Sequence, residues 1–271
     1  MKWFVKSLVV IGAMSVAMAA QAQALFGQKT DYATVAFHTG VQGENGARVA
    51  ALRMELKQGW KTYWRIPGDS GVPPHFDWAG SENLKSATTT WTVPSVFEAY
   101  GDRTIGYKTR MVVPLTLTPQ DPTQPIRVRL NFTYGVCADI CIPAGQEFAV
   151  DIPPNAPEDG AYFIERAMAE RLRPASAQEA EPAKCEIVRE GKETRLFVGL
   201  AFPEPFNRPP TILAEAPGAT FGRFDARQQD GGIIAMARVL DTEGGWIDRS
   251  ALRFTVLGDG RGMVITGCAG T

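Results

Sequence analysis

The sequence predicts an all-β protein in which a β-sandwich domain is followed by a second, smaller β-rich domain. Three observations lead to this fold class. Apolar residues alternate with polar ones in many short segments, clusters rich in Pro and Gly separate these segments, and only one stretch has the periodicity of a helix. Many short alternating strands joined by such turns are typical of a sandwich.

The segment 126–136 shows the alternation most clearly. A strand with this pattern buries one face and leaves the other in water. Segments 52–56 and 113–117 alternate in the same way, and turn-forming clusters at 67–74 and 118–125 separate the strands. In the first segment Ile126, Val128, Leu130, Phe132 and Tyr134 share one face, and Arg127, Arg129, Asn131 and Thr133 share the other.

One stretch, "EDGAYFIERAMAERLR" at 158–173, predicts a helix. Ile164, Met168 and Leu172 fall on one helical face, and the proline that follows cannot continue the helix. The next ten residues, 174–183, are poor in bulky apolar side chains and rich in Pro, Ala and Glu. This composition indicates a linker.

The chain therefore divides into four parts. Residues 1–24 are a predicted signal peptide, 25–153 the first β-sandwich domain, 154–183 the helix and linker, and 184–271 the second β-rich domain. The leader has early lysines, an apolar run and the small-residue ending "AQA". Its apolar run of about 14 residues is shorter than the roughly 20 that a membrane span needs, and no later segment is longer. We expect an exported protein without direct membrane insertion, which in a Gram-negative bacterium is periplasmic.

The charge balance and the motifs exclude several classes. The formal net charge of −1 offers no basic footprint for nucleic acid or for an anionic membrane. The sequence has no nucleotide-binding loop, nucleophile elbow or paired-carboxylate motif, so we expect no cofactor. Zinc usually takes four Cys or His ligands at short spacing, and His38 and His75 each lack a nearby partner ligand. No metal site is predicted from them.

The four cysteines form two unlike pairs. Cys185 and Cys268 flank the second domain, and a bond between them would close a loop of about 84 residues. The chain-entropy account gives such a bridge roughly 4–5 kcal/mol of stabilisation. This suits a structural disulfide, and the alternative is two separate thiols.

Cys137 and Cys141, in "TYGVCADICIP", would close only a very small loop. Four extended residue steps span about 13 Å, whereas the Cα atoms of bonded cysteines lie about 4.4–6.8 Å apart. A bond therefore requires the strand to end at Val136 or Cys137 and the next three residues to turn sharply. An exposed disulfide of this kind is a poor structural lock and is easier to reduce, which favours redox exchange. Two alternatives stay open: a local loop lock, and a Cu(I) clamp made by the two thiolates.

An aromatic block in the first domain has two interpretations: a platform on which a ligand such as a sugar stacks, or packing within the sandwich. Large aromatic side chains dominate cores, so we favour packing. The block consists of Trp60, Tyr63, Trp64, Trp78 and Trp91.

Three ordered segments, "GWKTYWRIPGDSGVPPHFDW" (59–78), "AYGDRTIGYKTRMVVPLTL" (99–117) and "VCADICIP" (136–143), together resemble the N-terminal periplasmic domain of the DsbD family of thiol:disulfide interchange proteins, with the ScsB-like branch as the most similar. The resemblance covers about residues 30–153. It implies an immunoglobulin-like sandwich in which Cys137 and Cys141 are the catalytic pair.

The family also implies the partners. A membrane-embedded thiol reductant conductor reduces the cysteine pair, which then reduces periplasmic proteins, many of them thioredoxin-like. The resemblance thus implies a protein-disulfide reductase component. The main rival is a periplasmic copper-binding or copper-tolerance protein that uses the same cysteines. A third possibility is an adaptor whose disulfides are all structural.

The sequence departs from the family pattern at the site. The best-known DsbD domain has five residues between its cysteines, and this chain has three. That domain also covers its cysteines with the phenylalanine of an Asp-Glu-Phe-Tyr-Gly loop. The matching stretch here is "FEAYG" (97–101), with Ala99 at the position of the phenylalanine. Glu98, Tyr100 and Asp139 are candidate modulators of the thiols, and solvated loop side chains are the alternative reading.

Overall fold

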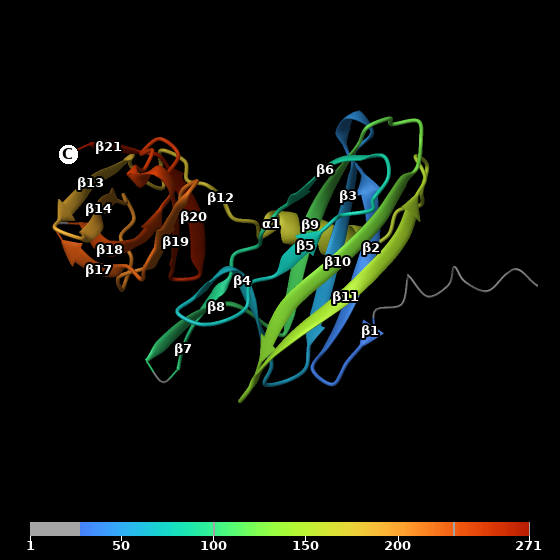
Figure 1. The fold of residues 1–271 in the computed structure, drawn as a ribbon, viewed down its shortest axis with the longest axis horizontal. Coiled ribbons are helices and arrows are strands. Elements are labelled where there is room, and N and C mark those ends of the chain that lie inside the picture. The colour runs from blue at the N-terminus through green and yellow to red at the C-terminus, as the bar shows by residue number, and fades with distance from the viewer. Residues whose placement is uncertain (1–27, 100, 230, 271) are drawn as a thin grey trace, which may run out of the picture.

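The computed structural model describes residues 28–99, 101–229 and 231–270. The predicted signal peptide and Tyr100 lie outside these ranges. Figure 1 shows two β-rich parts connected by one short helix and the segment after it. The predicted fold class is confirmed: an N-terminal sandwich precedes a second β-rich part. No helix within the described ranges has the length and apolarity needed to cross a membrane.

The first part is a sandwich of two mainly antiparallel sheets. In one sheet the strand order is β1 (Gln28–Lys29), β2 (Ala33–Gln42), β3 (Arg48–Leu56), β9 (Arg110–Pro119) and β6 (Leu84–Thr89), with a short 3-10 turn η1 (Glu44–Gly46) between β2 and β3. In the other the order is β11 (Cys141–Ile152), β10 (Ile126–Cys137), β4 (Lys61–Gly68), β8 (Asp102–Lys108) and β7 (Ser95–Ala99), and β5 (His75–Asp77) also pairs with β10.

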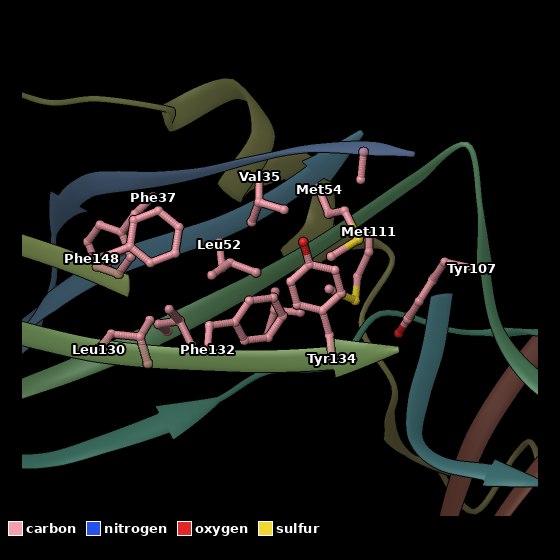
Figure 2. Close-up of a cluster of buried hydrophobic side chains, with 14 of the residues drawn as sticks. Val35, Phe37, Leu52, Met54, Tyr107, Met111, Leu130, Phe132, Tyr134 and Phe148 are labelled. Carbon is pink, nitrogen blue, oxygen red and sulfur yellow. The ribbon is translucent and has the colours of Figure 1, made fainter. Parts of the chain in front are cut away.

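The core lies between these sheets, as the alternation predicted. Along β10 every second side chain from Ile126 to Tyr134 is buried and the intervening ones are exposed. Figure 2 shows Phe132 and Tyr134 of β10 pointing toward Met54 and Met111, which come from the opposite sheet. The aromatic block packs as expected, because Trp64 is fully buried and Trp60, Trp78 and Trp91 lie against the core.

The helix α1 (Ala161–Ala169) is shorter than predicted. It starts after Gly160, which has a positive φ of 73°, and packs on the first sheet through Ile164 and Ala167. The predicted continuation to Leu172 is wrong. The Leu172 amide donates to the carbonyl of Trp91 instead, which draws the chain out of the helix and into an extended path.

The second part is also built from two sheets. One has the order β12 (Arg173–Pro174), β20 (Arg261–Thr266), β19 (Arg253–Gly258) and β15 (Thr211–Glu215). The other has the order β16 (Ala219–Phe221), β18 (Gly232–Thr242), β14 (Glu193–Ala201), β13 (Ala183–Glu190) and β21 (Cys268–Gly270), with β17 (Asp225–Gln229) also paired to β18 and the turn η2 (Glu243–Gly245) after it.

The segment expected to be a linker is partly fixed to this second part. β12 pairs in parallel with β20, and the Ala175 amide donates to the carbonyl of Val264. Ala180 belongs to the second core. Composition alone does not reveal these contacts, because they join residues far apart in the sequence.

Candidate redox site

The long hairpin of β10 and β11 places the two cysteines at its turn. The register runs without interruption from Ile126 opposite Ile152 to Cys137 opposite Cys141, where the ladder ends. The two cysteines are disulfide-bonded with their Cα atoms 4.1 Å apart. The strand ends at Cys137, one of the two predicted positions, and the Ala138 amide donates to the carbonyl of Ile140 across the turn.

The two sulfur-bearing residues differ in accessibility. Cys137 is only 7% exposed, whereas Cys141 is an exposed residue at the start of β11. Between them Ile140 is 67% exposed, so the turn presents an apolar tip to the solvent. An incoming thiolate must approach a sulfur along the S–S axis, and Cys141 is the more exposed of the two residues.

Tyr63 of β4 contacts the disulfide directly. Its hydroxyl oxygen lies 3.2 Å from Cys141 Sγ, and the residue is 1% exposed. Burial raises the pKa of the Tyr63 phenol, so the group keeps its proton through neutral pH. A disulfide sulfur carries no hydrogen, so the tyrosine O–H is the donor. The sequence predicted core packing for Tyr63, and no local pattern indicates this contact.

Glycines on two sides make room for the Tyr63 ring. A Cβ at Gly135 of β10 would lie 3.0 Å from the ring. A Cβ at Gly71, whose φ is +129°, would lie 2.3 Å from it. The ring is therefore held between a strand and the loop 69–74, and the loop also brings Val72 against Gly135. This packing fixes the direction of the hydroxyl toward Cys141.

Two lysines continue the row of the disulfide across the sheet. Cys137 pairs with Lys61 of β4, and Lys61 pairs with Lys108 of β8. Directly opposite residues project from the same face of a sheet, so both ammonium groups share the face of the cysteines. Lys108 Nζ lies 4.5 Å and Lys61 Nζ 5.9 Å from the ring centroid of Phe97 on β7. The register thus places two lysines in the row of Cys137, and both ammonium groups lie over Phe97.

The candidate modulators are found at different places. Glu98 accepts from Arg103 at 3.0 Å, and its carboxylate lies 3.8 Å from the guanidinium of Arg223 in the second part. Asp139 is exposed in the turn between the cysteines. Their influence on the thiols stays a prediction, and Tyr100 lies outside the described residues.

The second pair, Cys185 and Cys268, is bonded with a Cα–Cα distance of 5.7 Å. Cys185 is 1% exposed and belongs to the second core, and β21 pairs in parallel beside it. This disulfide joins β13 to β21, the last strand of the second part. Its environment is that of a structural bond and contrasts with the exposed turn of the first pair.

The structure brings together no group of three or more His, Cys, Asp or Glu side chains suited to a metal ion within the described ranges. Cys137 and Cys141 are thus the two ligands on which the copper-binding alternative depends, as in the sequence analysis.

A sandwich that carries a cysteine pair at a hairpin turn is consistent with thiol–disulfide interchange. Comparison with protein families matches residues 30–152 to the family described as "Thiol:disulfide interchange protein DsbD, N-terminal". This region of the chain therefore belongs to the DsbD N-terminal domain family.

The two-part fold has a counterpart among solved structures. The crystal structure of the N-terminal periplasmic domain of ScsB from Proteus mirabilis is similar over 89% of this chain and 95% of that chain, with a TM-score of 0.68 and 24% sequence identity. This likeness shows that both parts of the fold are shared. No curated protein matches the sequence.

The contact between Tyr63 and Cys141 leads to a prediction. In the reduced protein, the Tyr63 hydroxyl would donate to the Cys141 thiolate, and hydrogen bonds to charged groups contribute more than neutral ones. We expect Tyr63→Phe to slow alkylation of reduced Cys141 by iodoacetamide about tenfold at pH 7, with the thermal midpoint changed little. Tyr107→Phe is the matched control, because its hydroxyl donates to the carbonyl of Thr92, away from the cysteines. An unchanged alkylation rate in Tyr63→Phe would contradict this role.

Proposed function

We propose that this protein is a periplasmic thiol–disulfide interchange module, a protein-disulfide reductase component that passes reducing equivalents through Cys137 and Cys141. The observation that carries the proposal is the unequal exposure of the bonded pair: Cys141 is open to a partner, and Cys137 is covered beside Lys61. The membership of residues 30–152 in the DsbD N-terminal family supports the same reaction.

The reaction proceeds in two exchanges. A thiolate of a partner dithiol attacks Cys141 Sγ, a partner–Cys141 disulfide forms, the Cys137–Cys141 bond breaks, and Cys137 leaves as a thiolate that takes up a proton. The second thiolate of the partner then attacks the partner sulfur that is bonded to Cys141. The partner disulfide forms, and Cys141 leaves as a thiolate. The partner dithiol has lost two electrons and two protons and is oxidised, and the cysteine pair has gained them and is reduced.

The reverse sequence delivers the electrons. The Cys141 thiolate attacks the disulfide of a second protein, and Cys137 resolves the mixed disulfide, so that the pair is reoxidised and the second protein is reduced. By its family, we assign the donor role to a membrane-embedded thiol reductant conductor and the acceptor role to periplasmic thioredoxin-like proteins. No cofactor takes part in this scheme.

The experiment is a single-turnover transfer. Protein with Cys137 and Cys141 reduced is freed of dithiothreitol and mixed with an equal amount of an oxidised thioredoxin-like protein. Acid quenching and alkylation then report both redox states. We expect the disulfide to move to Cys137–Cys141 as the acceptor becomes reduced. If the acceptor stays oxidised and both thiols persist, the proposal is wrong.

Lys61 gives a second test of the same chemistry. A cation beside Cys137 stabilises the thiolate that leaves in the first exchange, so Lys61→Met should slow reduction of the pair by dithiothreitol about threefold to tenfold. This difference in reduction rate should shrink at high ionic strength, because salt screens the partly exposed charge of Lys61. Lys85→Met, on β6 of the other sheet, is the control. Equal rates for Lys61→Met and the wild type would remove Lys61 from the mechanism.

A further inference from the structure

We infer that Arg223, in the second part of the protein, is a positioning residue for thiol–disulfide exchange at Cys137 and Cys141; the inference rests on the proposed function. Arg223 lies between β16 and β17 and reaches into the first domain. Its Nη1 donates to Asp69 Oδ2 at 3.2 Å and to the carbonyl of Gly101 at 3.3 Å. These two acceptors belong to separate segments of the first domain, so one guanidinium joins both to the second.

Asp69 is the first link toward the disulfide. Its amide donates to the carbonyl of Arg103 at 2.8 Å, and its carboxylate accepts from the Arg103 amide at 2.8 Å. The Arg103 guanidinium in turn donates to Glu98 at 3.0 Å and 3.1 Å. Asp69 thus anchors the start of the loop 69–74 to the β7–β8 hairpin, and Arg223 adds a charged donor from outside the domain.

The loop 69–74 leads from Asp69 to the site. Gly71, two residues further on, lies against the Tyr63 ring, and the Tyr63 hydroxyl donates to Cys141 Sγ. Arg223 is therefore connected to the reactive sulfur through one short loop and one side chain. Gly71 packs against the Tyr63 ring. If the loop moved away, the Tyr63 ring would be free to turn, and its hydroxyl would leave Cys141 Sγ.

The Arg223 guanidinium lies beside a pocket between the two parts of the protein. This pocket of about 330 Å³ is lined by Ile66, Asp69 and Ile105 of the first part and by Leu213, Phe221 and Arg223 of the second. The second ion pair between the parts, Arg65 with Glu215 at 2.9 Å, binds β4 to β15 without touching the loop. It offers a matched control.

The test measures alkylation of reduced Cys141 by iodoacetamide between pH 6 and pH 10 in the full-length mature protein. Arg223→Ala should slow the reaction about threefold at pH 7 and move its pH profile upward, because the Tyr63 donor spends less time on the thiolate. Arg223→Lys should recover part of the rate. Glu215→Gln should leave the rate unchanged, and thermal unfolding should confirm that each variant is folded.

The decisive arm combines variants. If Arg223 acts through Tyr63, then Arg223→Ala should have no further effect in a Tyr63→Phe background. The inference is overturned by a wild-type or faster rate in Arg223→Ala, by an equal loss in Glu215→Gln, or by the same loss with and without Tyr63. A wild-type pair that cannot be reduced in the folded protein would defeat the proposed function, and the inference with it. Normal exchange with an unchanged Arg223→Ala defeats only the inference.

Discussion

Cys137→Ser is expected to convert a transient exchange into a stable mixed disulfide. This variant keeps the exposed Cys141, whose thiolate attacks a partner disulfide, and it lacks the cysteine that would resolve the product. The reduced variant, mixed with an oxidised thioredoxin-like protein, should accumulate a covalent 1:1 complex. Non-reducing electrophoresis shows the complex, and mass spectrometry of its peptides should find Cys141 as the linked residue.

Cys141→Ser is the matched control. It leaves only Cys137, which is 7% exposed and lies at the end of β10 behind the hairpin turn. Since a covered thiol reacts slowly with a protein-sized disulfide, we expect complex formation at least about tenfold slower than for Cys137→Ser. Faster trapping through Cys137 would reverse the assigned order of attack.

The second large effect is on stability and concerns the other pair. Replacing both Cys185 and Cys268 by alanine should lower the free energy of unfolding of the second part by about 3–5 kcal/mol, because the bond closes a long loop in the unfolded chain. Urea unfolding monitored by hydrogen exchange, read by mass spectrometry on peptides of the second part, measures the change. Replacing both residues avoids leaving a free thiol in the core.

The matched control for this prediction is the double alanine variant of Cys137 and Cys141. Its very short loop gives about 2 kcal/mol or less in the same chain-entropy account. A larger loss from the short-loop pair than from Cys185 and Cys268 would exchange the structural and redox roles that we assign to the two bonds.

The sequence was sufficient for the parts of the fold that depend on local pattern. Alternation along 126–136 predicted a half-buried strand, and the distance limits on bonded cysteines predicted its end at Val136 or Cys137. The helix was predicted too long, since its periodicity continues to Leu172 while a backbone hydrogen bond to Trp91 takes that residue into an extended path. That competing contact is between residues far apart in sequence.

The site was less accessible to sequence reasoning. Lys61 and Tyr63 lie on one face of β4, but only the register between β4 and β10 places them beside the cysteines. Glu98 was singled out by position in a motif, and the structure pairs it with Arg103 and Arg223. Arg223 and Asp69 are 154 residues apart, so no local pattern relates them.

The central claim is that Cys137–Cys141 opens and closes in the folded protein while Cys185–Cys268 stays bonded. The most direct test equilibrates the purified mature protein with a series of reduced and oxidised dithiothreitol or glutathione mixtures and reads each cysteine by alkylation and mass spectrometry. We predict that the short-loop pair is reduced while circular dichroism still shows the native fold, at a potential within reach of thioredoxin-like proteins. If this pair is reduced only on unfolding, or together with Cys185–Cys268, the interchange function is contradicted.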